Sequence, residues 1–204
     1  MRGSKLQVIL AVAALAALGV SSASAQQPQT MRIRGTIEKV DGNTVVVKPA
    51  SGADVTLTLT ANAVIVGVVK ASLADIKPGS FVGSAAMPQA DGSQKALEVH
   101  IFAESQRGTG EGHRPYTIPN STMTNGTVGV TVTGNDGHTL TVKYKEGEKK
   151  IVVSPGTPIV RYEIGDKDEL KAGAQVALLN VVKKPDGSLE GARVNVGRNG
   201  LVPQ

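Results

Sequence analysis

Cysteine is absent from the sequence, which is 204 residues long. Its absence excludes disulfide bonds, thiolate metal sites, a cysteine nucleophile and a lipid-modified N-terminal cysteine. The folded chain must therefore be stabilised by its apolar core alone.

Aromatic residues are scarce as well. The sequence has no tryptophan, and its aromatic rings are Phe81, Phe102, Tyr116, Tyr144 and Tyr162. Proteins that bind single-stranded nucleic acid stack successive bases on such rings above a basic groove. Phe81 and Phe102 fall in strands that we expect to be buried, so too few rings remain for that role or for an oligosaccharide platform. We therefore expect no nucleic-acid partner.

Charge of one sign is not concentrated anywhere in the chain. There are 22 Lys and Arg residues against 17 Asp and Glu. Loss of Arg2 and Lys5 with an N-terminal signal would leave 20 against 17, a net charge of only +3. This weak, interspersed charge does not indicate a polyanion groove or a charged tail. No second apolar run approaches membrane length, which excludes a multi-spanning transporter.

Residues 1–25 have the three parts of a signal peptide. A charged start is followed by an apolar run over residues 6–20 and by the small residues Ala23-Ser24-Ala25. We expect cleavage before Gln26, a periplasmic or secreted location and no membrane insertion after cleavage. The alternative is an uncleaved N-terminal anchor.

A stretch of about ten residues occurs twice, as Leu73–Val82 and as Lys167–Val176. In each copy an apolar strand and an Asp-Gly-Ser turn follow, with Asp91 in the first copy and Asp186 in the second. The offset between the copies is about 94 to 95 positions throughout, so the chain contains an internal repeat.

Each copy places a glycine, Gly79 or Gly173, directly after the residues that we expect to form a helical turn. Glycine adopts positive φ without steric cost, and it can therefore end a helix and reverse the chain into the next strand. We interpret the repeated stretch as a folding signal rather than as a binding site.

Alternation of apolar and polar residues predicts strands throughout both copies, for example over Met31–Val40 and Val55–Thr60. Asp-Gly turns between such runs predict hairpins. The fold class that we predict is all-β: two tandem small OB-like Greek-key barrels, each with one short helix between strands three and four. Unit 1 would span 31–104, an inter-repeat linker 105–124 and unit 2 125–199. A pair of β-sandwich or SH3-like modules is the alternative.

Short motifs in both copies resemble a secreted bacterial OB-like domain family of unknown function, which often occurs as tandem copies behind a signal peptide. The motifs in the first copy are Gly35-Thr36-Ile37, Asp41-Gly42-Asn43-Thr44, Leu73–Val82 and Asp91-Gly92-Ser93. Those in the second copy are Gly126-Thr127-Val128, Asp136-Gly137-His138-Thr139, Lys167–Val176 and Asp186-Gly187-Ser188. The resemblance implies the fold and the compartment, and it brings no catalytic residues.

The linker is not a copy of anything in either repeat, and it is rich in side chains that commonly take part in recognition. These candidate binding residues are Arg107, Glu111, His113, Arg114 and Tyr116. Long segments without regular structure are often functional. The alternative is a connector that packs across both barrels, with Tyr116 and Ile118 as anchors.

The sequence contains no recognisable catalytic or metal-binding pattern. His100, His113 and His138 are scattered, and none has a second ligand at the spacing that a regular element requires. There is no Gly-x-Ser-x-Gly nucleophile motif. We therefore expect neither an enzyme nor a cofactor, and we assign no catalytic and no metal residue.

Three functional hypotheses follow. The first is a non-catalytic periplasmic binding or interaction protein, whose partner is an unknown envelope protein or a small ligand. The second is an accessory periplasmic metal-handling protein, with Glu111 and His113 contributing ligands. The third is a small-ligand carrier with its pocket at the barrel–barrel junction.

Overall fold

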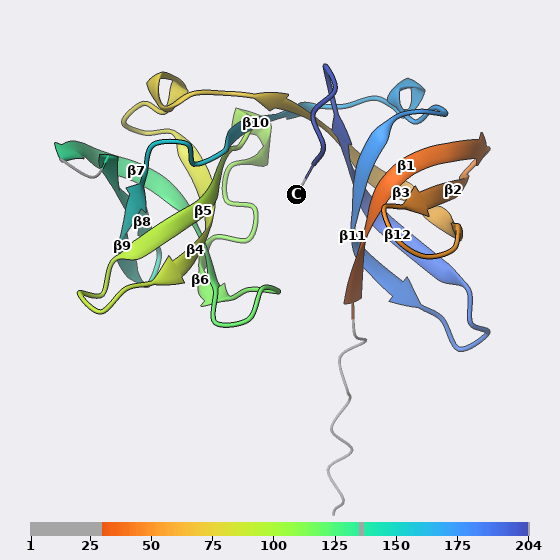
Figure 1. Ribbon diagram of the computed structural model, residues 1–204, viewed down its shortest axis with the longest axis horizontal. Coiled ribbons are helices and arrows are strands. Elements are labelled where there is room, and N and C mark those ends of the chain that lie inside the picture. The colour runs from red at the N-terminus through yellow and green to blue at the C-terminus, as the bar shows by residue number, and fades with distance from the viewer. Residues whose placement is uncertain (1–29, 135–136, 204) are drawn as a thin grey trace, which may run out of the picture.

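The computed structural model describes residues 30–134 and 137–203. The expected signal peptide, residues 1–25, lies outside the described residues. The described chain is all-β, as predicted, and its regular elements are twelve β-strands and three short 3-10 turns. The strands form two barrels that lie side by side (Figure 1).

Barrel 1, on the right in Figure 1, is a closed ring of five strands. These strands are β1 (Thr30–Asp41), β2 (Thr44–Pro49), β3 (Val55–Lys70), β11 (Gln175–Lys183) and β12 (Leu189–Gly197). The order around the ring is β12-β11-β1-β2-β3, and parallel pairing of β12 with β3 closes it. The alternating inward residues, such as Ile37, Val47, Leu57 and Leu178, form its apolar core.

Barrel 2, on the left in Figure 1, closes in the same way. Its strands are β4 (Phe81–Pro88), β5 (Gln94–Ile101), β7 (Thr122–Gly134), β8 (Gly137–Tyr144) and β9 (Gly147–Val153). The order is β5-β4-β7-β8-β9, and the parallel pair β5–β9 closes the ring. Val82, Val99, Leu140 and Ile151 are fully buried in its core.

The two rings do not coincide with 31–104 and 125–199, the units expected from the repeat. Barrel 1 contains three strands of the first repeat and two of the second. Barrel 2 contains two strands of the first repeat and three of the second. The repeats have therefore exchanged their last two strands. Neither repeat by itself contains the five strands of one ring.

Two equivalent segments carry the chain across between the barrels. The second half of the long strand β3 pairs with β12 as far as Val68, and it also pairs antiparallel with β10 (Ile159–Ile164), from Lys70 opposite Val160 to Val66 opposite Ile164. Because the two strands continue past the barrels instead of turning back, each delivers the chain to the other barrel.

An aromatic cluster fills the space where the crossing strands meet the barrels. Phe81, Phe102 and Tyr162 are buried there together with valines of β3 and β10. The ring centroids of Phe81 and Phe102 lie 5.2 Å apart, and those of Phe102 and Tyr162 lie 5.5 Å apart. Packing of this cluster joins the two barrels.

The repeated stretches form turns as expected, although each contains a 3-10 turn of only three residues: η1 (Leu73–Asp75) and η3 (Lys167–Glu169). Gly79 has φ of 85° and Gly173 has φ of 87°, which confirms the left-handed conformation predicted for both.

The linker packs mainly on barrel 2. It contains the 3-10 turn η2 (Glu104–Gln106) and a short strand, β6 (Gly112–Pro115), which pairs antiparallel with β7. The linker is thus an extra edge of barrel 2 rather than a free tether.

Candidate functional site

A cleft of about 990 Å³, which we call the junction cleft, lies where the barrels face each other. Barrel 1 contributes residues of β1, β11 and β12, and barrel 2 contributes residues of β4, β5 and β7. The linker adds residues 109–110 and 114–118 along one side. Clefts of this size between packed units are common ligand sites.

The two walls of the junction cleft are built from equivalent strands. In barrel 2, Ala85 of β4 is opposite Met123 of β7 and Glu98 of β5. In barrel 1, Leu179 of β11 is opposite Arg193 of β12, and Arg32 lies at the adjoining bulge of β1. Each of these sets is a row of three residues that lie side by side on neighbouring strands, and the two rows occupy equivalent positions in the two barrels. The two walls therefore have the same backbone arrangement and different side chains.

The barrel 1 wall is basic. Arg32, Arg34 and Arg193 all line the junction cleft. The guanidinium carbon of Arg32 lies 5.2 Å from the ring centroid of Tyr116, and that of Arg193 lies 5.5 Å from the ring centroid of Tyr162. Such stacking holds a guanidinium in place while leaving its edge available to an acceptor.

Two buried polar atoms at the cleft have no hydrogen-bond partner. They are Nη1 of Arg32 and Oδ1 of Asn125, on opposite walls. Nδ2 of Asn125, by contrast, donates to the Thr109 carbonyl at 3.0 Å. A buried unpaired donor or acceptor costs roughly 1–3 kcal/mol, so such atoms call for an explanation.

Glu98 is the carboxylate of the barrel 2 wall. Burial raises the pKa of Glu98 to about 7, although Arg32 and Arg34 across the cleft act to lower it. One side of Glu98 is closed by the C-terminal residues Leu201 and Pro203, which share a small cavity of about 10 Å³ with it. Glu98 therefore exchanges its proton close to neutral pH.

His100 lies behind Glu98 and remains neutral. Burial and the charges of Arg193, Arg114 and Arg32 lower the pKa of His100 to about 3. Its ring stacks on Tyr162, with the centroids 4.8 Å apart. The 4.0 Å contact from Nδ1 of His100 to Glu98 is accordingly not an ion pair.

Gly83 makes room for this arrangement. A Cβ atom at Gly83 would lie 2.0 Å from Nε2 of His100 and 2.6 Å from Oδ1 of Asn125. In β4 it pairs with both residues, and no side chain fits between them. The glycine thus allows His100 and Asn125 to approach each other behind the cleft.

The structure brings two of the five predicted linker residues into the junction cleft: Arg114 and Tyr116. Nη1 of Arg114 donates to the Gly110 carbonyl at 2.7 Å. Arg107 instead binds Glu104 and the Gly79 carbonyl, at 2.9 Å from the latter.

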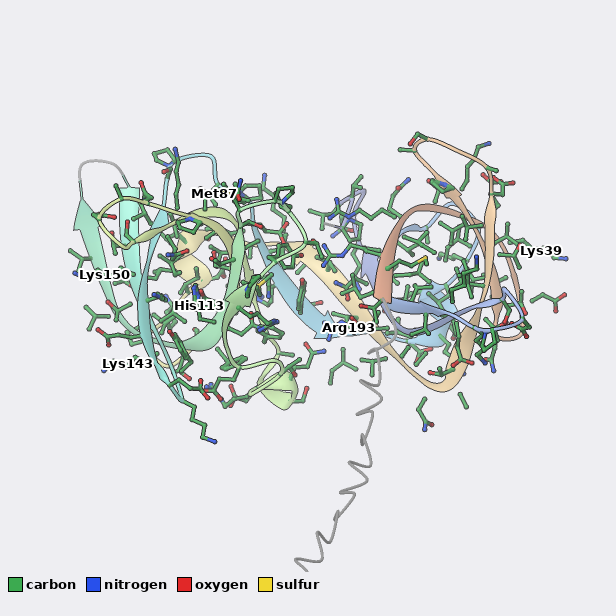
Figure 2. The ribbon with its side chains drawn as sticks, turned by 90° about the horizontal axis from the view of Figure 1, so that it is seen from below. Lys39, Met87, His113, Lys143, Lys150 and Arg193 are labelled. Carbon is green, nitrogen blue, oxygen red and sulfur yellow. The ribbon has the colours of Figure 1, made fainter. Side chains whose placement is uncertain are left out.

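Glu111 and His113 do not line the junction cleft. Glu111 is exposed, whereas Nδ1 of His113 lies 2.8 Å from Oγ1 of Thr124, on barrel 2. Figure 2 shows His113 within barrel 2 and Arg193 between the barrels. Across residues 30–134 and 137–203, no three His, Asp or Glu side chains are grouped closely enough to hold a metal ion.

The residues that the sequence did not single out are those of the strands: Arg32, Arg34, Glu98 and Arg193. Each occupies an outward position in an alternating strand, where a charged residue ordinarily indicates a solvent-facing side. The exchange of strands turns these outward faces toward each other. A comparison of the two repeats could have identified them, because Glu98 and Arg193 occupy the same position in the two copies and carry opposite charges.

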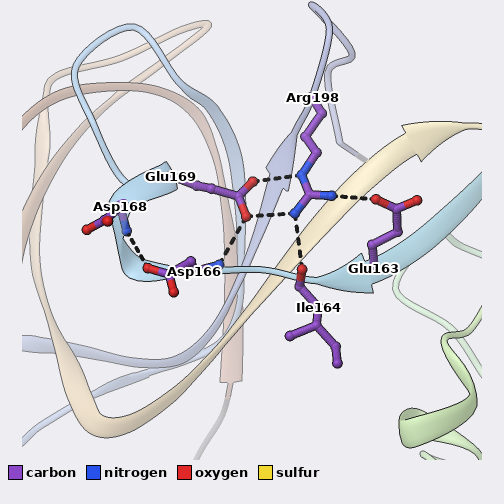
Figure 3. Close-up of polar contacts among 6 residues, drawn as sticks. All are labelled: Glu163, Ile164, Asp166, Asp168, Glu169 and Arg198. Atoms are coloured by element: carbon purple, nitrogen blue, oxygen red, sulfur yellow. Dashed lines mark hydrogen bonds and ion pairs between the residues drawn. The ribbon is translucent and has the colours of Figure 1, made fainter.

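Arg198 shows how an arginine of this chain is paired when its role is structural (Figure 3). It donates to Glu169 at 2.9 and 2.8 Å and to the Ile164 carbonyl at 3.1 Å, and it also contacts Glu163. This network fastens the end of β12 to β10 and η3. All the nitrogens of its guanidinium are used, in contrast to Arg32.

Comparison with protein-family models, with curated proteins and with solved structures found no match. In the part of the chain that the structure describes, no helix has the length and apolar character needed to cross a bilayer.

Proposed function

We propose that the protein is a non-catalytic binding protein that acts outside the cytoplasm and holds a small ligand in the junction cleft. The observation that carries this proposal is the cleft of about 990 Å³ between the barrels, whose lining combines the cations Arg32 and Arg193 with the apolar side chains of Leu97 and Met123. A few polar groups set among apolar side chains are the usual lining of a small-molecule site. The signal-like residues 1–25 support the extracytoplasmic location.

Glu98 raises the question of catalysis, since a perturbed pKa in a cleft is typical of a general acid or base. Its neighbour His100 has a pKa of about 3 and stays neutral near neutral pH, so the two do not form a proton-transfer pair there. We therefore assign Glu98 to the control of charge in the binding site.

We also propose that each barrel is OB-like. We number the strands of each barrel by their place in a repeat, so that barrel 1 is β1, β2, β3, β11, β12 and barrel 2 is β7, β8, β9, β4, β5. In both barrels the first strand then lies between the second and the fourth, and the third pairs in parallel with the fifth. A short turn, η1 or η3, precedes the fourth strand in each. This order supports the OB-like interpretation, with the fourth and fifth strands supplied by the other repeat.

A ligand-dependent melting screen tests the binding function. A ligand that binds only the folded state raises the melting temperature, and the rise grows with the logarithm of the ligand concentration once this exceeds the dissociation constant. We expect hits from a library of small acids, amides, amines and sugars, and we expect Thr117→Trp, at the cleft, to abolish them. Thr56→Trp, at an exposed position of β3, is the control and should retain them. Hits that persist in Thr117→Trp, or no hits at all, would contradict the proposal.

A further inference from the structure

We infer that the junction cleft binds an organic anion, whose acidic group is held by Arg32 and Arg193 and whose apolar body lies against the barrel 2 wall. This inference rests on the proposed function, because it names the ligand class for the same cleft.

Three other arginines of the described chain are paired with carboxylates, whereas Arg32 and Arg193 are not. Arg107 and Arg161 each contact one carboxylate, of Glu104 and of Asp75, and Arg198 contacts two. Among the described residues, no carboxylate oxygen lies within 4.0 Å of a nitrogen of Arg32 or Arg193. Burial lowers the pKa of Arg193, which shows that its charge is held away from water without a carboxylate partner.

Both guanidinium groups are already oriented by aromatic rings. Tyr116 supports Arg32, and Tyr162 supports Arg193. Nε of Arg193 also donates to Oδ1 of Asn195 at 3.1 Å. A fixed, planar guanidinium recognises a carboxylate through two parallel hydrogen bonds, and little side-chain entropy is then lost on binding.

Arg32 and Arg193 stand close enough together on the barrel 1 wall to share one acidic group. They stand on β1 and β12, on either side of β11, so their backbones are separated by two strand spacings, or about 10 Å. Two extended arginine side chains can reach one acidic group across that span. Both arginines line the cleft, and both are close enough to His100 on the facing wall to lower its pKa.

Apolar side chains line the rest of the cleft and suit an apolar body. Leu97 and Ile118 line it and are 39% and 43% exposed, and Met123 lies beside them on the barrel 2 wall. An inorganic anion such as phosphate would leave this apolar surface in water. An organic acid would cover it and gain free energy from its burial.

A panel of paired compounds tests the inference on the exported chain, residues 26–204. The acids are hexanoate, octanoate, benzoate and phenylbutyrate, each paired with its primary amide, and acetate and inorganic phosphate serve as anions without an apolar body. Calorimetric titration should show that at least one of these acids binds about tenfold or more tightly than its amide, which lacks the charge. Acetate and phosphate should bind more weakly than that acid.

Substitutions then locate the acidic group. Arg32→Met introduces the residue found at the equivalent position of the other wall, and it should weaken binding of that acid about tenfold or more. Arg32→Lys keeps the positive charge without the planar guanidinium, and its affinity for the acid should lie between those of the parent protein and Arg32→Met. Lys39→Met removes the same charge at an exposed site at the far end of barrel 1, and it should have no effect (Figure 2).

The outcomes separate this inference from the proposed function. If the amides bind as well as the acids and Thr117→Trp abolishes both, the cleft is a binding site but not one for anions. If Lys39→Met weakens the acid as much as Arg32→Met, the effect is one of net charge and the inference is overturned. If no acid of the panel binds at all, the inference is likewise overturned, while the wider library still tests the proposed function.

Discussion

The two walls of the junction cleft have the same backbone framework and opposite chemistry. Where barrel 1 has Arg32 and Arg193, barrel 2 has Met123 and Glu98 at the equivalent positions. A strictly repeated sequence would give two identical walls and a symmetric cleft. The difference at a few outward positions instead gives the cleft a basic side and an apolar, proton-exchanging side. Under the proposed function this difference would fix the orientation of the ligand.

This comparison depends on the strand exchange. In each barrel the first, fourth and fifth strands form the cleft wall, and the fourth and fifth come from the other repeat. Each wall therefore combines residues of both copies. Changes in either copy alter both sides of the cleft.

The largest expected effect is the formation or absence of an introduced disulfide bond, which tests the exchange of strands between the two repeats. Thr58 of β3 is opposite Glu190 of β12 in barrel 1. Without exchange, Thr58 would instead be opposite Lys95, the residue of the first repeat equivalent to Glu190. Since the chain has no cysteine, Thr58→Cys with Glu190→Cys should form one intramolecular disulfide in nearly every molecule, because paired strands bring the Cα atoms within bonding range.

The matched control for that test is Thr58→Cys with Lys95→Cys, which places the second thiol in barrel 2. It should remain reduced under the same oxidation, as judged by electrophoretic mobility and free-thiol titration. A rapid disulfide in the control and none in the first variant would mean that each repeat closes on itself.

The next effect compares a paired arginine with an unpaired one. Arg198→Met should lower the free energy of unfolding by about 2 kcal/mol, because Glu163 and Glu169 lose their shared cation. Arg193→Met should change it by less than about 1 kcal/mol or raise it, because an unpaired, partly buried charge is removed. Urea denaturation measures both. Equal losses would show that Arg193 is a structural residue.

A smaller effect concerns the row of the barrel 2 wall that contains Gly83 and His100. The equivalent residues in barrel 1 are Ala177 and Asn195. Gly83→Ala should cost about 1–3 kcal/mol, because its methyl group would overlap His100, which is held by Tyr162.

The double variant Gly83→Ala with His100→Asn reproduces two positions of the barrel 1 row, and the cost of Gly83→Ala should be much smaller in the His100→Asn background than in the parent protein. A double-mutant cycle measures this coupling. Strictly additive effects would show that His100 is not what requires the glycine.

The smallest expected effect is a change with pH in the affinity for an organic acid, which arises from Glu98 on the barrel 2 wall. The pKa of Glu98 is about 7, so above that pH the wall gains a negative charge that opposes an anion. The groups that act on Glu98 or lie close to it are Arg32, Arg34, His100, Tyr162 and Arg193. The pKa of Tyr162 is raised by burial and by Glu98, so the phenol stays neutral, as His100 does.

Affinity for an organic acid should therefore fall by less than about tenfold from about pH 6 to about pH 8. Glu98→Gln should bind the same acid with little pH dependence over that range. Calorimetry at both pH values measures this change, and a rise in affinity with pH would contradict the assignment.

The sequence was sufficient for the local features of the fold. The repeat, the positions of most strands and the turn glycines Gly79 and Gly173 follow from periodicity and backbone preference. The exchange does not follow, because the fourth and fifth strands of the two copies have the same alternation. Either pair could complete either ring, and the sequence does not reveal that β3 pairs with β10 of the other copy where the chain passes between the barrels.

The site was predicted less completely. The density of recognition-type residues in the linker drew attention to Arg114 and Tyr116, which line the junction cleft, and also to Arg107, Glu111 and His113, which do not. The arginines of β1 and β12 could not be identified, because an arginine at an outward strand position has the same pattern whether it faces solvent or another barrel.

The most direct test of the central claim exchanges the charges of the two walls. We predict that Arg193→Glu reduces calorimetric affinity for an organic acid at least about a hundredfold, because a held cation becomes an anion. Adding Glu98→Arg to that variant returns a cation at the equivalent position of barrel 2 and should restore part of the affinity. Unchanged affinity in Arg193→Glu, in a variant that melts like the parent protein, would contradict the account.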